Sequence, residues 1–435
     1  MAQKHVVILG AGFAGLGAVR VLGREKNLRV TLVDKNNYHL FLPLLYQVAS
    51  AGLEAPQIAM PIRAFLRRYP NANFVMGQAE RVDLQAKVVV VEGKPIPYDY
   101  LIVGSGSRSF DFGIPGVAQY AIGLKSLEEA LHIRDRALSA AEEAVRTNDP
   151  QRRKALLTFV IVGGGPTGVE LAGALGELKK HVVARDYPEL RGAELRIVLI
   201  EAGKRLLNAF SEGSSRYVEN SLKSLGVEVL KESRVAEVSE AGVRLESGEF
   251  IPSYLVIWSA GVAGAALPGL PTTRGNRVAT TPELFVPEAP EVYVAGDMNY
   301  LEVNGKPLPQ VAPTAMQQGT WAARNILRHL RGQKQLPFRY KDKGNLAVLG
   351  RAKAVAELGR VKFKGFLAWV TWLAVHIYYL AGFRNRLLVL SNWAYSYLTY
   401  DYAVRIIHHR HSFPQGEEFK KAPEPVLMET GVRKG

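Results

Sequence analysis

The 435-residue sequence contains no cysteine at all. Disulfide bonds, thiolate metal sites, iron–sulfur clusters and cysteine nucleophiles all require that residue, so none of them is expected, and no metal site is predicted. The chain also starts without signal-peptide anatomy, because "MAQKHVVILG" runs directly into a predicted strand. The length predicts two to three domains, in a protein that stays in the cytoplasm.

Acidic residues are in deficit, with 40 Asp and Glu against 55 Lys and Arg, so the net charge is +15. Such an excess indicates an anionic partner, either nucleic acid or an anionic membrane, unless it is diffuse surface charge. The sequence has no helix-turn-helix, zinc-finger or RNA-binding signature, so nucleic acid is not expected as a partner.

The stretch "VVILGAGFAGLGAVR" has the pattern of a strand, a glycine turn and a helix. Gly10 allows the tight turn, Gly12 lets the backbone approach a pyrophosphate, and Gly15 lets helix and strand pack closely. A second predicted strand, "LRVTLVD", ends at Asp34, whose carboxylate would accept hydrogen bonds from a ribose. This arrangement predicts dinucleotide binding; the alternative is a purely structural turn.

A second copy of the pattern occurs in "FVIVGGGPTGVEL", with Gly163, Gly165 and Gly168 at the equivalent places. The following predicted strand, "LRIVLIE", ends at Glu201, and an acid there favours NADH because it repels a 2′-phosphate. NADPH stays an alternative, because the nearby Arg205 could accommodate a 2′-phosphate. Two dinucleotide folds in one chain have a chemical explanation, since a bound flavin can link a nicotinamide to other electron acceptors.

Two further stretches complete the pattern: "YDYLIVGSGS", and "EVYVAGDMNYL" with its Gly296-Asp297 pair. Together with the glycine turns, they resemble the two-dinucleotide-binding-domain flavoproteins, in which an NAD fold interrupts the FAD fold. The expected fold class is α/β, with two Rossmann-like domains and a C-terminal amphipathic helical membrane-attachment region. The expected boundaries are 1–112 and 276–345 for the FAD-binding domain, 113–275 for the NADH-binding domain, 346–412 for the membrane-associating region, and 413–435 for a flexible tail.

The segments "APTAMQQGTWAARNI" and "NNYHLFLPLLYQVASAGL" resemble those of type II NADH:quinone oxidoreductases. The first is similar to their A-Q-x-A-x-Q motif, with Pro313 in place of the first Gln. The disulfide reductases and sulfide:quinone oxidoreductases of this superfamily work through cysteine, so the sequence excludes their chemistry. The resemblance implies hydride transfer from NADH to FAD and two electrons passed on to a membrane quinone, menaquinone or ubiquinone, without proton pumping.

The resemblance also implies the site residues. It places Gln317 between flavin and quinone and Glu170 close to the nicotinamide, with Gln318 and His376 in the quinone site. The cofactor contacts it implies are Gly10, Gly12, Phe13, Ala14, Gly15, Asp34, Lys35, Ala79, Gly296, Asp297 and Ala315 for FAD, and Gly163, Gly165, Pro166, Thr167, Gly168 and Glu201 for NADH. Other interpretations stay open: the glutamines as ordinary polar residues at a helix start, Glu170 as a partner of the helix dipole, and His376 as a core histidine.

From Gly365 to Phe383 the chain has no Asp, Glu, Lys or Arg and is rich in aromatic residues. Aromatic rings and intermittent basic groups are typical of helices that lie in a membrane interface. We expect peripheral, monotopic attachment to the lipid surface at the cytoplasmic face of the cell membrane, by a homodimer. The alternatives are a soluble NAD(P)H-dependent reductase that serves a ferredoxin-like carrier, and a redox-sensing flavoprotein.

Overall fold

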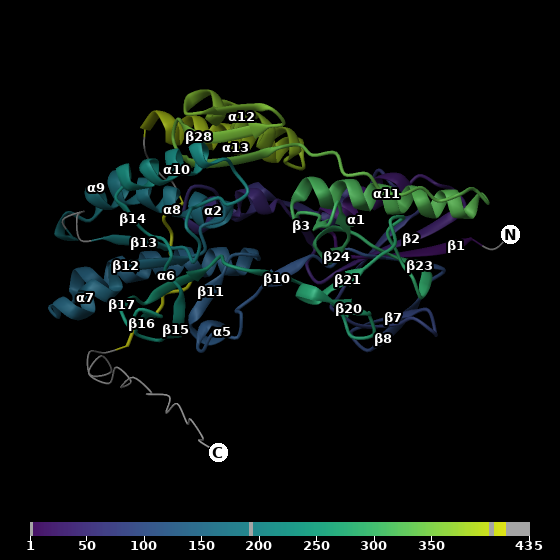
Figure 1. Ribbon diagram of the computed structural model, residues 1–435, viewed down its shortest axis with the longest axis horizontal. Coiled ribbons are helices and arrows are strands. Elements are labelled where there is room, and N and C mark those ends of the chain that lie inside the picture. The colour runs from purple at the N-terminus through teal and green to yellow at the C-terminus, as the bar shows by residue number, and fades with distance from the viewer. Residues whose placement is uncertain (1–2, 191–194, 400–403, 415–435) are drawn as a thin grey trace, which may run out of the picture.

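The computed structural model describes residues 3–190, 195–399 and 404–414 (Figure 1). The tail predicted from residue 413 onward lies, from residue 415, outside the described residues. The chain forms two α/β lobes, and a third region of late sequence packs on top of one of them (Figure 1).

The first lobe is built on a six-stranded sheet whose last strands come from far along the chain. In spatial order the strands are β22 (Phe285–Val286), β23 (Ala289–Val294), β9 (Tyr100–Val103), β1 (Lys4–Leu9), β2 (Leu28–Asp34) and β5 (Ala72–Met76). All pairs from β23 to β5 are parallel, and β22 is an antiparallel edge. The predicted interruption of one fold by another is therefore confirmed.

Two helices, α1 (Phe13–Leu22) and α11 (Ala312–Leu330), cover one face of this sheet, and β6 (Ala79–Asp83), β7 (Val88–Val91) and β8 (Lys94–Pro97) lie on the other (Figure 1). The helices approach closely because Gly319 has no side chain: a Cβ there would be 2.0 Å from the Ala14 carbonyl oxygen. This contact brings the start of α11 to the first glycine turn.

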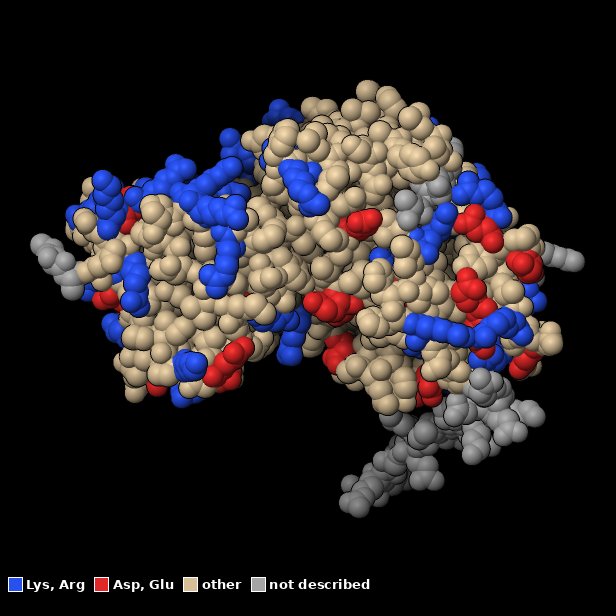
Figure 2. Space-filling view, turned by 180° about the vertical axis from the view of Figure 1, so that it is seen from behind, with Lys and Arg blue, Asp and Glu red and all other residues tan. Residues whose placement is uncertain are grey.

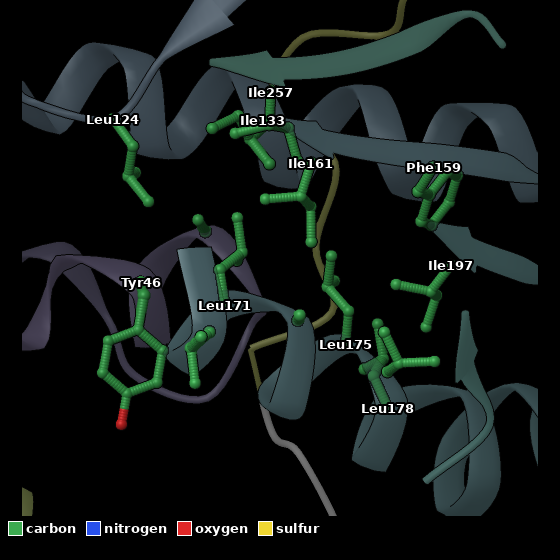
Figure 3. Packing of buried hydrophobic residues seen from close by; sticks show 14 of the residues in the cluster. Tyr46, Leu124, Ile133, Phe159, Ile161, Leu171, Leu175, Leu178, Ile197 and Ile257 are labelled. Carbon is green, nitrogen blue, oxygen red and sulfur yellow. The ribbon is translucent and has the colours of Figure 1, made fainter. Parts of the chain in front are cut away.

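The second lobe is built on a five-stranded parallel sheet. Its strands are β11 (Ala121–Gly123), β18 (Leu255–Trp258), β12 (Thr158–Val162), β13 (Arg196–Ile200) and β14 (Val227–Leu230), with helices α6 (Leu127–Arg146), α8 (Pro166–Leu178) and α10 (Glu212–Ser224) around it. Its core joins Ile161 and Ile257 of the sheet to Leu171 and Leu175 of α8 (Figure 3). Tyr46 of α2 (Leu45–Ala49) belongs to the same core, which ties the two lobes together.

The C-terminal region begins with strands rather than with a helix. β27 (Asn345–Gly350), β28 (Lys353–Leu358) and β29 (Val361–Lys364) form an antiparallel sheet, followed by α12 (Phe366–Tyr379) and α13 (Phe383–Thr399). The sheet docks on α8 at Gly173, where a Cβ would be 2.2 Å from the Leu349 carbonyl oxygen. The helices of the predicted membrane-associating region therefore stand on a small sheet fixed to the second lobe.

Helix α12 has one buried side and one exposed side. Ala368, Trp372 and His376 follow one another at four-residue spacing and are buried, whereas the Leu367 and Tyr378 side chains are 68% and 71% exposed. Within the described ranges, no helix has both the length and the apolar character needed to cross a membrane.

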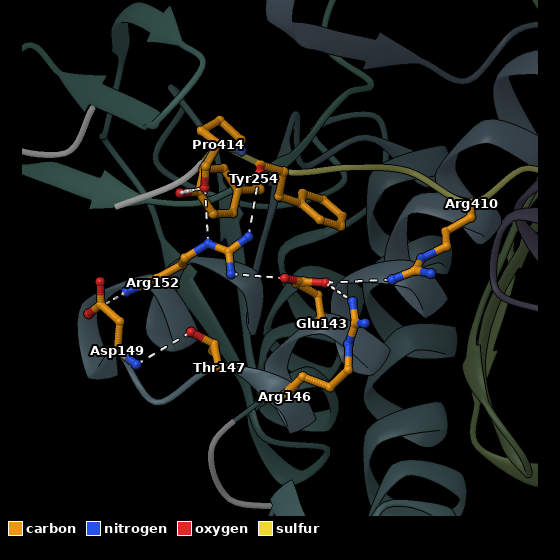
Figure 4. A network of polar contacts seen from close by, with 9 residues as sticks. Glu143, Arg146, Thr147, Asp149, Arg152, Tyr254, Arg410 and Pro414 are labelled. Carbon is orange, nitrogen blue, oxygen red and sulfur yellow. Dashed lines mark hydrogen bonds and ion pairs between the residues drawn. The ribbon is translucent and has the colours of Figure 1, made fainter. Parts of the chain in front are cut away.

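Beyond α13, the described residues 404–414 return along the second lobe to α6 and α7 (Pro150–Leu156) (Figure 4). Arg152 donates from Nε to the Pro414 carbonyl, at 3.0 Å, and from Nη1 to Glu143, at 2.9 Å. Glu143 also pairs with Arg146 and, at 3.9 Å, with Arg410. This strap fastens the chain to the second lobe a second time, away from α12 and α13.

Candidate functional site

The first glycine turn has the geometry of a phosphate-binding loop. Gly10 has a φ of +92°, and a Cβ there would be 2.3 Å from the Gly104 carbonyl oxygen, so only glycine fits. Gly15 packs equally closely, with a hypothetical Cβ 1.9 Å from the Gly10 oxygen. Gly12, at the N-terminus of α1, has no atom within 4 Å of where its Cβ would lie. The turn thus leaves an open cradle where the helix presents unpaired N–H groups.

Asp34 at the end of β2 closes this turn. Its carboxylate accepts hydrogen bonds from the backbone N–H of Ala11, at 2.6 Å, and of Asn36, at 2.8 Å. Burial raises the pKa of Asp34, and the two N–H bonds act in the opposite direction. The carboxylate therefore organises the turn and also faces the cavity beside it.

A cavity of about 370 Å³ extends from this turn across the carboxyl ends of the first sheet. Ten of the eleven residues predicted to contact FAD line it, and the eleventh, Gly15, packs behind the turn. The ten are Gly10, Gly12, Phe13, Ala14, Asp34, Lys35, Ala79, Gly296, Asp297 and Ala315. A cavity that starts at a glycine cradle and continues past Asp34 to Asp297 suits a dinucleotide whose pyrophosphate lies at the helix N-terminus.

The far end of the cavity is held by Gln318, which the family resemblance places in the quinone site. Gln318 is 1% exposed, accepts a hydrogen bond from the Gly296 N–H at 2.8 Å, and donates to Asn299 Oδ1 at 3.3 Å. Asp297 accepts a hydrogen bond from Ser107 Oγ at 2.6 Å. Because both ends of its amide are used inside the protein, Gln318 positions the Gly296-Asp297 turn.

The second glycine turn repeats the first one in detail. Gly163 has a φ of +112°, Gly168 packs with a hypothetical Cβ 1.9 Å from the Gly163 oxygen, and Gly165 has open space around its Cβ position. Glu201 accepts hydrogen bonds from the N–H groups of Gly164, at 2.7 Å, and Gly203, at 2.6 Å. Gly164 and Gly203 thus take the places that Ala11 and Asn36 have in the first turn, as hydrogen-bond donors to the acid. Pro166 occupies the first turn of α8, which suits a residue without an N–H group.

Glu170 lies between the two lobes. A pocket of about 70 Å³ is lined by Glu170 and Thr167 of α8, together with Leu42 and Lys125, which also line the large cavity. The buried Glu170 carboxyl accepts a hydrogen bond from the Val348 N–H of β27, at 3.3 Å, and lies beside Trp372. Burial raises its pKa to about 8. Its partner is thus the C-terminal sheet, rather than the helix N-terminus.

We expect a Glu170→Gln variant to be stabilised at alkaline pH. Between the ordinary pKa of 4.5 and the folded value of about 8, the folded protein retains a proton that the unfolded chain has released. The free energy of unfolding of the wild type therefore falls as pH rises through this window, and glutamine removes that fall. The variant should be similar to wild type at pH ~5 and more stable by on the order of 4 kcal/mol at pH ~9, by urea unfolding. Glu212→Gln, on the exposed side of α10, is the control, and parallel pH profiles for wild type and Glu170→Gln would contradict this expectation.

The other two predicted quinone-site residues lie in different surroundings. Gln317, on α11, pairs with the backbone of Lys341, accepting from its N–H at 2.9 Å and donating to its carbonyl at 3.0 Å. His376 is buried, stacks on Trp372 with ring centroids 3.9 Å apart, and donates from Nδ1 to the Trp372 carbonyl at 2.7 Å. Burial lowers the pKa of His376 to about 4, so the ring is uncharged at neutral pH. The structure thus gathers Glu170 and His376 around Trp372, while Gln317 holds the chain that leads to the C-terminal sheet.

Several cavity residues are missing from the sequence-based set. Ser107, Arg108, Gln78, Tyr38 and Lys125 all line the large cavity. The segment "YDYLIVGSGS" carried a signal for Ser107, because it repeats the pattern of a strand followed by glycines. Tyr38 belongs to the segment "NNYHLFLPLLYQVASAGL", which carries the family resemblance. Gln78, Arg108 and Lys125 carry no signal of their own and reach the cavity only through tertiary packing. Across the part of the chain that the structure describes, no three His, Asp or Glu side chains gather as metal ligands would.

Two family models match the chain. The model of the pyridine nucleotide-disulphide oxidoreductase family matches residues 4–319, and that of the NDH2 C-terminal domain matches residues 343–400. Among solved structures, the chain is similar to NDH2 of Plasmodium falciparum in complex with NADH. The TM-score is 0.85 at 22% identity, over 92% of this chain and 99% of that one. The predicted fold class is therefore confirmed.

Relatives of known name span nearly the whole chain. The type II NADH:quinone oxidoreductase Ndh of Mycobacterium tuberculosis is 36% identical, over 91% of this chain and 89% of its own. A type II NADH:quinone oxidoreductase of Haemophilus influenzae is 30% identical, over 82% of this chain and 87% of its own. The chain therefore belongs to the pyridine nucleotide-disulphide oxidoreductase family and, within it, to the type II NADH:quinone oxidoreductases.

Proposed function

We propose that the protein oxidises NADH and reduces a membrane quinone, with FAD held between the two substrates. The observation that carries this proposal is the pair of open glycine cradles, at Gly12 and Gly165, one in each lobe. Two cradles accommodate two dinucleotides in one chain, and family membership supplies their identities.

In the first lobe, the ten cavity-lining residues and Gly15 hold FAD. The N–H groups at the start of α1 receive the pyrophosphate, Asp34 accepts a ribose hydroxyl, and Asp297 receives the ribityl region. This assignment is supported by the cavity, which the start of α1, Asp34 and Asp297 all line. When bound, the flavin supplies the chemistry that accepts a hydride and releases two electrons.

In the second lobe, the turn at Gly163 to Gly168, with Pro166 and Thr167, receives the NADH pyrophosphate. Glu201 receives the adenosine ribose and disfavours a 2′-phosphate. Glu170 lies toward the nicotinamide, in the pocket that adjoins the flavin cavity. A carboxyl with a pKa of about 8 exchanges protons readily near neutral pH, so Glu170 is suited to hold and move the proton that hydride and quinone chemistry requires.

For the quinone, we propose that Gln317 lies between it and the flavin, on the helix that brings Ala315 to the cavity. His376 contributes as an uncharged ring: its Nδ1–H is used by the Trp372 carbonyl, so Nε2 is an acceptor of hydrogen bonds. Because the His376 ring is uncharged and its Nδ1–H is already hydrogen-bonded, His376 has no proton to give to the quinone. Glu170 is therefore the proposed proton donor.

An anaerobic visible spectrum tests the function directly. In detergent-solubilised protein, NADH should bleach the flavin bands, and a short-chain quinone should restore them within one turnover. Bleaching that quinone does not reverse would contradict the acceptor and point to a soluble electron carrier. Protein purified without flavin bands would contradict the whole proposal.

We also propose that the enzyme, as a homodimer, attaches peripherally to the lipid surface at the cytoplasmic face, without pumping protons. Exposed apolar side chains of α12 and α13 form a surface that we term the apolar face. It consists of Phe366, Leu367, Val370, Tyr378, Phe383, Leu387, Leu390 and Leu398. Figure 2 shows this region as a nearly uncharged dome at the top of the molecule. Side chains of this kind bury in the boundary between headgroups and acyl chains.

A Leu367→Glu/Phe383→Glu/Leu398→Glu variant should be released from membranes. The three side chains are 68%, 77% and 81% exposed, so the protein core is unaffected. Loss of about 1.5–3 kcal/mol of burial for each side chain predicts a fall of at least 100-fold in partitioning to phosphatidylcholine vesicles, by co-sedimentation. A Val303→Glu variant, at an exposed position on the first lobe, is the control. Unchanged partitioning of the triple variant would contradict attachment through the apolar face.

A further inference from the structure

The excess positive charge of the chain is concentrated on one part of the first lobe. Residues 13–26, 62–68 and 324–343, which we term the basic shoulder, contain thirteen Lys and Arg and two acidic residues. Their net charge of +11 accounts for most of the +15 of the whole chain. The thirteen are Arg20, Arg24, Lys26, Arg63, Arg67, Arg68, Arg324, Arg328, Arg331, Lys334, Arg339, Lys341 and Lys343, and all but Arg328 are exposed.

Contacts between the segments make the shoulder one continuous surface. The Arg20 guanidinium lies 5.8 Å from the centre of the Phe65 ring, which joins α1 to α4 (Ile62–Leu66). Arg331 pairs with Glu25 at 3.3 Å, which joins the ends of α11 and α1. The linker after α11 then runs back to Gln317 through Lys341 and continues into β27.

The two acidic side chains of the shoulder do not neutralise it. Glu25 is engaged by Arg331, and Asp342 accepts a hydrogen bond from the Gly344 N–H at 2.8 Å. Stacking over Phe65 restrains Arg20 while its guanidinium stays at the surface, since this residue is exposed. Arginines fixed in this way present several N–H donors outward, a geometry that suits phosphate oxygens.

The shoulder adjoins the apolar face. In Figure 2, Lys and Arg side chains follow the upper outline of the first lobe, starting beside the uncharged dome of α12 and α13. A flat surface laid against this side of the molecule would therefore contact both the dome and the basic side chains. A bilayer offers both parts of such a surface: an apolar boundary for the dome, and a plane of phosphates for the shoulder.

We propose that the basic shoulder is a second membrane contact, which binds the headgroups of anionic phospholipids and fixes the tilt of the enzyme on the bilayer. This inference rests on the proposed peripheral attachment and extends it to the first lobe. The lipid surface is favoured over nucleic acid because the basic shoulder is continuous with the apolar face. A polynucleotide binds basic side chains through its phosphates but would leave the apolar face uncovered.

Three variants test the shoulder. Arg67→Glu/Arg324→Glu/Lys334→Glu reverses three exposed shoulder charges for which no side-chain partner is present among the described residues. Arg81→Glu/Lys94→Glu/Arg274→Glu changes net charge equally at exposed positions on β6, on β8 and between β20 (Thr272–Thr273) and β21 (Arg277–Ala279). These elements lie on the side of the first sheet opposite to α1 and α11 (Figure 1). The apolar-face variant described above is the third. Unchanged reduction of the flavin by NADH confirms that each is folded.

Co-sedimentation is measured with vesicles of phosphatidylcholine alone and of phosphatidylcholine mixed with phosphatidylglycerol. We expect the shoulder variant to lose about 100-fold or more in partitioning to the anionic vesicles, because each of the three reversed side chains replaces attraction to an anionic surface by repulsion. On neutral vesicles it should match wild type, and the opposite-side variant should match wild type on both.

Equal losses in the shoulder and opposite-side variants would overturn the proposal, because net charge alone would then explain binding. No loss in either would also overturn it, as would tighter retention on duplex DNA than on anionic vesicles. If wild type binds anionic vesicles but not neutral ones, attachment through the apolar face is contradicted while headgroup binding by the shoulder is still supported. The two proposals can therefore fail independently of each other.

Discussion

A Gly12→Val variant should purify as folded, colourless protein. Gly12 has a φ of −72° and no neighbouring atom within 4 Å of its Cβ position, so a β-carbon is accommodated there without backbone strain or collision. The valine instead fills the cradle that the pyrophosphate needs. Losing two charge-assisted N–H bonds, each worth about 1.5–3 kcal/mol, predicts a fall of at least 100-fold in FAD affinity, and NADH oxidation falls with it.

The measurement is the ratio of flavin to protein absorbance after purification, with melting temperature as the folding control. Wild type stripped of flavin and the variant should melt at the same temperature, and added FAD should raise it only in wild type, because a ligand that binds the folded state alone stabilises it. Gly213→Val, at another open glycine position on α10, should retain its flavin. A fully yellow Gly12→Val protein would show that the cavity beside α1 is not the flavin site.

The same substitution in the second lobe should have the opposite signature. In Gly165→Val the flavin bands should remain, because Gly165 lies in the other lobe, also with open space at its Cβ position. The valine displaces the NADH pyrophosphate from the start of α8. The same loss of about 1.5–3 kcal/mol for each of two bonds raises the KM for NADH by at least 100-fold.

Reduction by dithionite followed by reoxidation with a short-chain quinone separates the two half-reactions. The Gly165→Val flavin should be reoxidised at the wild-type rate, since its quinone side is untouched. If NADH still reduces this variant at wild-type concentrations, the second turn does not bind the nicotinamide dinucleotide. If instead flavin is lost, the assignment of the two turns is reversed.

Much of the site follows from local sequence. The two glycine turns and their acids lie within contiguous segments, where Gly10 and Asp34 are joined by one strand–helix–strand unit. A positive φ admits glycine far more readily than other residues, and a parallel pair of strands brings the acid back beside the turn, so spacing alone predicts the geometry. The apolar, aromatic C-terminus likewise predicted exposed apolar helices.

Other features of the site depend on contacts between segments that lie far apart in the sequence. The pKa of Glu170 depends on burial beneath β27 and Trp372, which lie about two hundred residues away in the sequence. The motif places Gln318 in the quinone site, and only the fold shows that its side-chain amide accepts a hydrogen bond from the Gly296 N–H. The sequence predicts one membrane-associating region over residues 346–412, and the fold places the small sheet of β27, β28 and β29 at its start, before α12.

The physical distinction is between backbone geometry and environment. Turn conformation, helix capping and strand register are set by interactions within a few residues or one supersecondary unit, so the sequence by itself determined the geometry of the two glycine turns and of the acids that close them. Burial, desolvation and the gathering of charge depend on what packs against a side chain. Only the tertiary structure therefore decided that burial raises the pKa of Glu170 and lowers that of His376, and that thirteen scattered basic residues form one shoulder beside the apolar face.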